Sequence, residues 1–585
     1  MKHLKIVNYN IRIYPKRNNN ITYFSKLTLL NRYLTKKETY QDIFIRVSIV
    51  YSKNAYHAQK LYNYMSNFFF LPSTPILSNG GSSRGLPISC FLNEVNDNLN
   101  DIKNIWNENI ALASEGGGIG TYWGYIRSIG EKIINSGYTS GIIPFLAVQD
   151  KLTLAISQGS LRRGSAAVYL NVNHPEIEEF IEIRRPIGGD INRKTLNLHH
   201  GIVISDDFMS SVENNNFWEL KSPYDQSVIH KIKARDLWIK ILLSRVETGE
   251  PYLFFKSEIN KKKSYIYKKL NLNTKTSNLC SEITLTTGKD HLFNNRTAVC
   301  CLASINIVKY KDWSNDKYFI FVIINLLDNI LQDFINHSCS SLIKSKYSSY
   351  RERSIGLGVM GFHSFLQSKY IFIESILAKK WNNKIFKYIN YMSNISSQKI
   401  SQIKKQCPDA KSLNYPKRFL HRIAIAPTAT ISIIAGNISP GIEPYNSNLY
   451  NQKTITGSYN IYNKYLKRLL YKKKRNIKKV WSSIISNEGS IYHLNFLNIK
   501  EKKIFKTSFE IDQQHLISLA VDRTKYICQS QSLNLFIKSN INKLDLNKIH
   551  YFSWKKGIKT LYYLRSKSLQ RTEIIGSQNM PKKNL

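Results

Sequence analysis

The sequence predicts an α/β protein, built either as a barrel or as a doubly wound sheet. Strand-like segments such as 166–170 alternate with helix-like segments such as 177–183 over several hundred residues. This alternation is typical of strand–helix–strand units around a large sheet. Clusters of glycine and small residues lie between the segments, at 79–81, 116–120, 159–160 and 188–189. Because glycine lets backbone approach a ligand closely, these clusters are candidate ligand contacts.

Length and composition indicate a folded protein of more than one domain. The chain has 585 residues, with 42% hydrophobic and 12% aromatic residues. That is too long for one ordinary domain and ample for a large core. We find no apolar run long enough to span a bilayer and no signal-peptide pattern. We therefore expect a cytoplasmic protein that does not contact a membrane.

The net charge of +44 has two interpretations. It could serve nucleic-acid binding, or it could reflect a genome whose base composition favours Lys, Asn and Ile codons. The cations are spread along the chain and interleaved with Asn, Tyr and Ile. A nucleic-acid footprint should be a compact patch, so we favour the compositional interpretation and regard nucleic acid as an unlikely partner. A positive field would still attract anionic nucleotides.

Changes of composition along the chain predict four regions. They are a helical N-terminal region (1–67), an α/β core (68–452), a C-terminal α/β region (453–565) and a flexible tail (566–585). Helices are expected near 40–51 and 57–67. Within the third region, residues 453–498 are rich in Lys, Asn and Ile and weakly patterned, which predicts a peripheral segment.

Seven cysteines are too few for a disulfide scaffold, and in a reducing compartment such cysteines are more often catalytic, metal-bound or buried. No Cys-x-x-Cys and no Cys/His cluster with zinc-like spacing is present, so no metal site is expected.

One short motif suits radical chemistry, because Asn278, Cys280 and Glu282 alternate in sequence. In extended backbone they would share one face, where a thiol, a carboxylate base and an orienting amide could meet. A motif this short is frequent by chance, and the alternative is a small buried cysteine beside a surface acid.

The flanking residues favour the first interpretation. The run 276–283 resembles the radical finger loop of the class I ribonucleotide reductase large (alpha) subunit, and the resemblance extends from about residue 27 to about residue 565. It implies a ten-stranded α/β barrel with a central finger loop, preceded by a short helical region. It also implies that Cys280 carries a thiyl radical, that Glu282 is the base, and that Asn278 orients the substrate.

The same resemblance implies a redox pair. Residues 73–75 and 89–92 resemble the first cysteine region of the family, and 298–304 resemble the second. Cys90 and Cys300 would then supply two electrons by closing a disulfide. We expect the remaining cysteines to be inert.

In a chain with 36 tyrosines, the pair Tyr562-Tyr563 would by itself indicate hydrophobic packing. Between 557–560 and Leu564-Arg565, however, it resembles the radical-transfer tyrosines of the family. The pair would pass an oxidising equivalent to Cys280 from a separate, metal-containing small (beta) subunit. A cobalamin-dependent class II reductase would not need this relay and is kept as an alternative.

Substrate and effector sites are implied as well. Proline followed by hydroxyl residues at 427–432 predicts a helix start that binds phosphate, although an ordinary capped helix has the same pattern. With Asn437 and 441–445 it resembles the diphosphate site of the family. The implied substrate-binding residues are Thr74, Ser89, Gly118, Thr428, Ala429, Thr430, Ile431 and Ser432. Residues 158–165 resemble the loop that couples the effector site to the substrate site. The implied ATP- or dNTP-binding residues are Asp97, Asn98, Leu99, Arg127, Arg162 and Arg163.

The expected reaction is radical reduction of ribonucleoside diphosphates, with no cofactor bound in this chain. Expected partners are the small subunit, a thioredoxin- or glutaredoxin-type reductant and a second copy of the chain.

Only about 65 residues precede the barrel, so we expect no ATP-cone domain. The resemblance implies a C-terminal tail with a cysteine pair that re-reduces the disulfide, but no cysteine follows Cys528, so the tail 566–585 lacks it. We therefore expect either that an external thiol reaches the Cys90–Cys300 pair directly or that activity is low. A decayed nucleotide- or nucleic-acid-binding protein without turnover is the remaining alternative.

Overall fold

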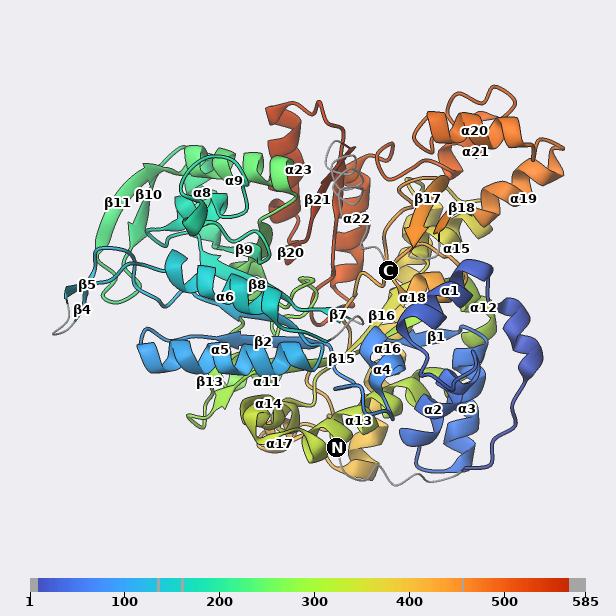
Figure 1. Cartoon of the computed structure of the whole chain (residues 1–585), viewed down its shortest axis with the longest axis horizontal. Coiled ribbons are helices and arrows are strands. Elements are labelled where there is room, and N and C mark those ends of the chain that lie inside the picture. Colours follow the sequence, from blue (N-terminus) through green and yellow to red (C-terminus); the bar gives the residue numbers. More distant parts are fainter. Residues whose placement is uncertain (1–8, 134–136, 159–161, 455–456, 568–585) are drawn as a thin grey trace, which may run out of the picture. The chain divides into compact units, whose positions relative to one another are not determined.

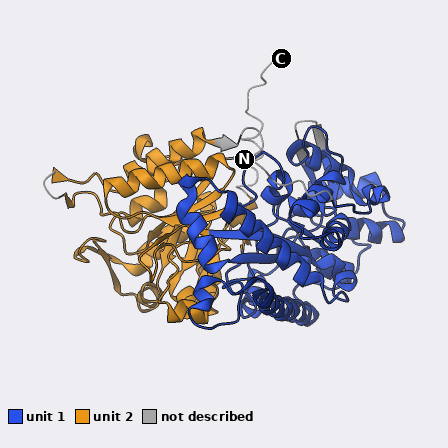
Figure 2. Ribbon diagram, turned by 90° about the horizontal axis from the view of Figure 1, so that it is seen from below, with its two compact units in different colours: residues 1–89, 299–531 blue, residues 90–298, 532–585 orange. Residues whose placement is uncertain are grey.

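The computed structural model describes residues 9–133, 137–158, 162–454 and 457–567 (Figure 1). The chain forms two compact units, and each unit is made from two stretches of sequence. Unit 1 comprises Met1–Ser89 and Val299–Gln531, and unit 2 comprises Cys90–Ala298 and Ser532–Leu585 (Figure 2). The last stretch of the chain therefore folds with residues that precede it by about three hundred positions.

The main sheet of unit 2 has the strand order β2-β3-β8-β9-β12-β20. Its strands are β2 (Cys90–Glu94), β3 (Gly118–Tyr122), β8 (Ser165–Asn171), β9 (His199–Ile204), β12 (Tyr252–Phe255) and β20 (Thr560–Leu561). The first five are parallel and β20 is antiparallel to β12. The strands are almost entirely buried, as expected for a parallel sheet covered on both faces.

Helices connect the parallel strands, which cannot be joined by tight turns. They are α5 (Leu99–Ser114), α6 (Ile143–Ala155), α7 (Ile177–Glu182), α8 (Asp206–Asn214) and α9 (Ala234–Thr248). The strand expected at 166–170 and the helix expected at 177–183 are thus confirmed as β8 and α7. Local sequence sets the ends, because Asn98 caps α5 through its side chain and Gly249 ends α9 with a φ of 82°.

Smaller elements complete unit 2. They are β4 (Lys132–Ile133), β5 (Gly137–Tyr138), β6 (Ser157–Gln158), β7 (Arg162–Arg163), β10 (Phe217–Lys221), β11 (Val228–Lys233), α10 (Lys256–Lys261), α11 (Tyr265–Lys269), β13 (Gly288–Lys289), β14 (Asn295–Arg296), β19 (Leu535–Ile537), α23 (Lys543–Lys555) and β21 (Leu564–Ser566). Strand β19 pairs in parallel with β21, which ties the end of the described chain into this unit.

Unit 1 is mainly helical. Its helices are α1 (Tyr23–Arg32), α2 (Asp42–Val50), α3 (Ala55–Ser66), α4 (Thr74–Asn79), α12 (Tyr310–Trp313), α13 (Phe319–His337), α14 (Ile343–Glu352), α15 (Phe362–Ser368), α16 (Ile376–Lys404), α17 (Pro408–Lys411), α18 (Ile431–Ile434), α19 (Lys464–Lys472), α20 (Lys478–Ser486), α21 (Ile499–Ile504) and α22 (Gln513–Thr524). The helices expected near 40–51 and 57–67 are α2 and α3. The strands are β1 (Phe70–Pro72), β15 (Ala298–Asn306, from Val299 on in unit 1), β16 (Ile355–Met360), β17 (Leu449–Thr454) and β18 (Gly457–Tyr462). Strand β15 is antiparallel to β1 and parallel to β16.

Helix α13 corrects one expectation, because it is long and apolar enough to cross a membrane by length and composition. In its most apolar stretch 67% of the residues are buried inside unit 1, where the helix packs against α16. Its buried Asp328 lies 2.7 Å from both Arg353 and Lys404, and 3.0 Å from Arg418. Burial alone would raise the pKa of Asp328, but these cations lower it, so the helix carries a buried carboxylate held by three cations. These contacts are those of a core helix.

The weakly patterned segment 453–498 also differs from expectation. It contains the hairpin β17–β18 and helices α19 and α20, although residues 455–456 lie outside the described part. Leu466, Leu470 and Ile484 are fully buried in a hydrophobic cluster of this segment. Each helix is only nine residues long, with mainly lysine, arginine and serine on its outer face and a few leucines and isoleucines in the core.

Gly120 in β3 is where the segment containing Asn278 packs against the sheet, since a Cβ at this position would overlap the carbonyl oxygen of Ser277. We expect Gly120→Ala to lower the free energy of unfolding by about 1–3 kcal/mol, the usual cost of overpacking. Urea unfolding of the full chain measures this. A Cβ at Gly188 would meet nothing within 4 Å, so Gly188→Ala is the matched control and adds only local backbone strain. Equal stabilities of the two variants would contradict the close packing.

Candidate active site

The loop that carries Asn278, Cys280 and Glu282 is a tight turn and not an extended strand, which corrects the expected geometry. Ser281 has a φ of 62°, and its N–H donates to the carbonyl oxygen of Asn278 at 3.2 Å. Two side chains of unit 2 fix the turn. The Tyr169 hydroxyl donates to the Asn278 carbonyl at 2.9 Å, and the Thr560 hydroxyl donates to the Ser281 carbonyl at 2.8 Å. The three predicted site residues are gathered by this turn and not by strand alternation.

The Asn278 side chain joins the loop to the amino end of β2. Its Nδ2 lies 3.5 Å from the Cys90 sulfur, and its Oδ1 accepts from the N–H of Ile283 at 3.2 Å. Cys90 is buried and lies beside Gly118 in the neighbouring strand. Three predicted residues therefore meet at the amino ends of β2 and β3. They are Asn278, the redox cysteine Cys90 and the substrate-binding Gly118.

Glu282 is buried, with 1% of its surface exposed. Burial raises its pKa to about 7, against the opposing effect of hydrogen bonds from Asn278 and Ser532. The Ser532 hydroxyl lies 3.1 Å from Glu282 Oε2 and 2.6 Å from the carbonyl oxygen of Cys280. Glu282 can thus exchange a proton near neutral pH. Ser532 was not predicted from the sequence, where its only signal is the polar run 529–532, which is buried throughout.

The tyrosine pair follows β20, whose pairing with β12 brings it beside the loop. Backbone bonds fix it further, since Tyr562 N donates to the Leu533 carbonyl at 2.9 Å and Tyr563 N donates to the Asn534 side chain at 3.0 Å. The two rings are 4.3 Å apart between centroids. Burial raises the pKa of Tyr562 well above its ordinary value, and a hydrogen bond with the Cys280 side chain raises it further. The structure therefore brings Tyr562, Tyr563 and the half-buried Cys280 together.

The residues predicted in unit 1 form a separate set. Cys300 is buried in β15, with the Gln529 side-chain amide 3.6 Å from its sulfur. The Thr74 hydroxyl is 2.9 Å from the Tyr33 hydroxyl, and Ser89 is buried. Because Cys90 belongs to unit 2, its pairing with Cys300 stays a prediction.

The predicted phosphate segment in unit 1 differs from the expected helix start. Helix α18 is a single turn that begins at Ile431, not directly after Pro427, because Thr428 takes a φ of 53°. The Thr428 hydroxyl accepts from the N–H of Gly441 at 2.7 Å, which ties the segment to the 441–445 turn. Ala429 and Thr430 form the turn that leads into α18, and the N–H of Ser432 donates to the Thr428 carbonyl oxygen at 3.1 Å.

Four of the predicted effector residues follow β2 or β3, namely Asp97, Asn98, Leu99 and Arg127. Arg127 Nε is 2.5 Å from Asp97 Oδ2, and the guanidinium lies 4.5 Å from the centroid of the Tyr224 ring. Asn98 caps α5, and Leu99, the first residue of that helix, is exposed. Arg162 and Arg163 form β7 opposite β6, but their side chains and residues 159–161 lie outside the described part.

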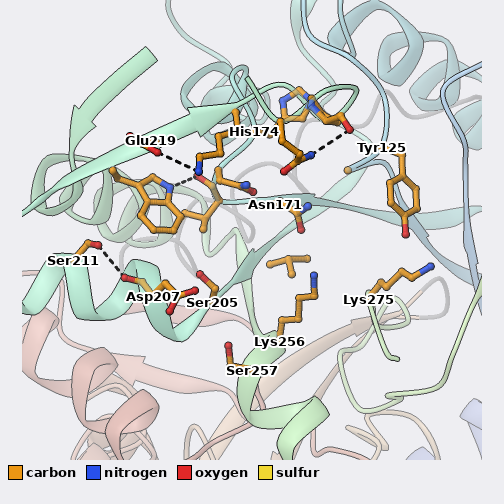
Figure 3. A pocket seen from close by; sticks show the side chains of 18 of the residues that line it. Tyr125, Asn171, His174, Ser205, Asp207, Ser211, Glu219, Lys256, Ser257 and Lys275 are labelled. Atoms are coloured by element: carbon orange, nitrogen blue, oxygen red, sulfur yellow. Dashed lines mark hydrogen bonds and ion pairs between the residues drawn. The ribbon is translucent and has the colours of Figure 1, made fainter. Parts of the chain in front are cut away.

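A cavity of about 1060 Å³ lies in unit 2 at the carboxyl ends of β3, β8, β9 and β12 (Figure 3). Its lining includes Tyr125, Asn171, Lys256 and Lys275, but none of the predicted catalytic residues. Cys90 and Gly118 lie at the amino ends of their strands, so the cavity does not mark the predicted catalytic site. Within the described residues, no group of three or more His, Cys, Asp or Glu side chains could hold a metal ion.

Comparisons with known proteins all point to one family. The family model "Ribonucleotide reductase, barrel domain" matches residues 88–421 and 409–564, and the "all-alpha domain" model of the same enzymes matches residues 19–85. The ribonucleoside-diphosphate reductase large subunit of Invertebrate iridescent virus 3 is 38% identical over 569 residues, which covers 88% of each chain. The large chain from Cryptosporidium parvum is 30% identical over 618 residues, covering 94% of this chain and 75% of its own.

A solved structure gives the same result. The Actinobacillus ureae class Id ribonucleotide reductase alpha subunit superposes with a TM-score of 0.83 at 31% identity, covering 94% of this chain and 98% of its own. The predicted fold class and the predicted family are therefore confirmed, whereas the boundaries of the four predicted regions stay a prediction. The chain belongs to the ribonucleotide reductase large-subunit family.

Proposed function

We propose that this chain reduces ribonucleoside diphosphates to deoxyribonucleoside diphosphates by radical chemistry. The proposal is supported by family membership, and the observation that carries it is the arrangement of Tyr562, Cys280 and Glu282. A phenol hydrogen-bonded to a thiol, beside a carboxylate with a pKa of about 7, suits hydrogen abstraction coupled to proton removal. Binding of nucleotides alone would need neither group.

In the proposed reaction the Tyr562 radical takes the hydrogen atom of the Cys280 thiol. The Cys280 thiyl radical then takes the 3′-hydrogen of the ribose, while the Glu282 carboxylate accepts the proton of the 3′-hydroxyl. The 2′-hydroxyl takes a proton from the Cys90–Cys300 dithiol and leaves as water. The dithiol then gives a hydrogen atom to C2′ and one electron to the sugar as it closes the disulfide, and the Glu282 proton returns to the 3′-oxygen. Cys280 returns the hydrogen to C3′, and its thiyl radical takes a hydrogen atom back from Tyr562. Asn278 would orient the sugar, since its Nδ2 already faces Cys90.

The other groups complete the proposal. Thr74, Ser89, Gly118 and the turn 428–432 would bind the diphosphate substrate. A metal-containing small subunit would supply the oxidising equivalent to Tyr563 and Tyr562. A thioredoxin- or glutaredoxin-type protein would regenerate the dithiol. We also propose a homodimer, located in the cytoplasm, that binds ATP or dNTP effectors through residues 97–99, Arg127 and the 162–163 strand.

A single-turnover assay tests the reaction. Pre-reduced chain, a candidate small subunit, CDP and an effector are mixed, and dCDP is counted per chain. We expect nearly stoichiometric dCDP in the unchanged chain and a loss of at least about a thousandfold in Cys280→Ser and in Tyr562→Phe, because each removes a step of the radical route. Cys339→Ser, at an exposed cysteine outside the proposed site, is the matched control and should keep full yield.

Three other results would overturn parts of the proposal. CDP binding without dCDP would support a decayed nucleotide-binding protein. Turnover that needs cobalamin and no small subunit would support a class II reductase. Full turnover in Tyr562→Phe would remove the tyrosine from the route while leaving the reaction itself in place.

The raised pKa of Glu282 predicts the pH dependence. The proton acceptor is the carboxylate, so the single-turnover rate should rise tenfold per unit below about pH 7 and level off above it. Glu282→Gln should lose the activity and leave CDP binding intact. The raised pKa also means that the protonated side chain favours the folded state, and this contribution is lost as pH rises through about 7. A rate that is flat from pH 6 to pH 8 would contradict the assignment of Glu282 as base.

The Asp97–Arg127 pair predicts how effectors bind. We expect Arg127→Gln to weaken dTTP binding about 10- to 100-fold, which corresponds to one or two hydrogen bonds to a charged group. Equilibrium dialysis at fixed ionic strength measures this. Lys240→Gln, which removes the same charge from α9, is the control. Equal affinities in both variants would exclude Arg127 from the effector site.

A further inference from the structure

A buried carboxylate in unit 2 lies beside the tyrosine pair without belonging to the predicted site. Glu250 has 1% of its side chain exposed. Its Oε1 is 2.5 Å from His199 Nδ1, and its Oε2 accepts from the His200 N–H at 3.0 Å and lies 3.2 Å from His200 Nδ1. The Arg184 guanidinium is 3.5 Å away. Both oxygens of this carboxylate therefore face donors, Oε1 from His199 and Oε2 from His200 and Arg184.

These neighbours keep Glu250 ionised. Burial would raise its pKa, but the charges of His199 and Arg184 and the hydrogen bonds from both histidines lower it below its usual range. A carboxylate at 2.5 Å requires a proton on the facing nitrogen, so His199 carries its proton on Nδ1. The Nδ1–H is thereby oriented by Glu250.

The same nitrogen also faces Tyr563. His199 Nδ1 lies 3.3 Å from the Tyr563 hydroxyl oxygen, and the two rings meet edge to face at 81°. The ring of Tyr252 stacks against the imidazole with an interplanar angle of 17°, and it also lies 5.1 Å from the Tyr563 ring. The imidazole is therefore packed on its face by Tyr252, and its Nδ1 lies within hydrogen-bond distance of both the Glu250 carboxylate and the Tyr563 oxygen.

We propose that His199 is a positioning residue for radical transfer, whose Nδ1–H, oriented by Glu250, holds the Tyr563 oxygen and stabilises the neutral tyrosyl radical there. This inference rests on the proposed function, in which Tyr563 carries the radical before Tyr562. A tyrosyl radical oxygen has no proton and can only accept a hydrogen bond, so a fixed N–H donor at this point favours it. A neutral phenol can donate elsewhere and depends less on this donor.

The step balances without another reactant. The Tyr563 radical takes a hydrogen atom from the Tyr562 hydroxyl, so one O–H bond breaks in Tyr562 and one forms in Tyr563. One electron and one proton move together, and His199 keeps its own proton throughout. The ring centroids of the two tyrosines are 4.3 Å apart, which is suitable for this exchange.

The test uses the full chain with the small subunit, with 3-aminotyrosine in place of Tyr563. Aminotyrosine is oxidised more easily than tyrosine, so the radical stops at this position and can be observed by electron paramagnetic resonance. We expect a strongly coupled exchangeable proton in the chain with His199, and loss of this coupling in His199→Phe. With natural Tyr563, His199→Phe should lower the single-turnover rate about tenfold, the value of one hydrogen bond.

Further variants separate positioning from folding. His199→Gln keeps an N–H donor and should recover part of the coupling, whereas Glu250→Gln should weaken it by releasing the donor. His230→Gln, on the exposed strand β11, makes the same change elsewhere in unit 2 and should alter nothing. An unchanged coupling and rate in both His199→Phe and Glu250→Gln would overturn the inference.

Failure of the proposed function has a different signature. No radical at position 563, together with full dCDP yield, would remove Tyr563 from the route and overturn this inference with it. No dCDP in any variant would overturn the reaction itself. A radical at 563 with unchanged coupling in His199→Phe would overturn only the role of His199.

Discussion

The pairing of β20 with β12 is the contact on which the rest of the candidate site depends. It joins Thr560–Leu561 to strand β12, which lies some three hundred residues earlier in the chain. Two consequences follow. The Thr560 hydroxyl bonds the turn at Ser281, and the next two residues, Tyr562 and Tyr563, come to lie beside Cys280. Closing so large a loop is costly, but the cost grows only slowly with loop length, so a short strand in a buried sheet can hold it.

Burial favours a raised pKa for two carboxylates of this unit, but their neighbours differ and so do the outcomes. Glu282 has neutral hydrogen-bond partners, and burial raises its pKa to about 7. Glu250 is equally buried, but His199, His200 and Arg184 lower its pKa. The first carboxylate can therefore exchange a proton near neutral pH, while the second remains a fixed negative charge. Neighbouring charge, and not depth, separates the two roles.

The sequence predicted the chemistry of the site better than its geometry. Asn278, Cys280 and Glu282 were identified by their types and by their flanking residues, but the assumption of extended backbone was wrong. The positive φ of Ser281 depends on bonds from Tyr169 and Thr560, which lie far away in the chain. The same reason explains why Ser532 and His199 were missed. A serine or histidine acquires its role here from a partner that only the fold brings near.

The fold class could be predicted because alternating segments such as 166–170 and 177–183 carry their periodicity locally. Residues 453–498 were not predicted as helices, because α19 and α20 are only nine residues long each and lie in a segment rich in Lys, Asn and Ile that has no longer pattern. Helix α13 shows the opposite problem. Its continuous apolar sequence is that of a helix surrounded by protein, with the Asp328 carboxylate neutralised by cations from three other segments. Composition alone does not separate such a helix from a membrane span.

The tyrosine cluster restricts how an oxidising equivalent can move through it. Burial raises the pKa of Tyr252, Tyr562 and Tyr563, so an isolated phenolate is unfavourable at each. An isolated phenol cation would be unfavourable for the same reason, since a low-dielectric site penalises any unpaired charge. Moving an electron and a proton together avoids both charges at every step. The Tyr562 hydroxyl is hydrogen-bonded to the Cys280 side chain and the Tyr562 ring lies 4.3 Å from the Tyr563 ring, so the cluster favours transfer of neutral hydrogen atoms.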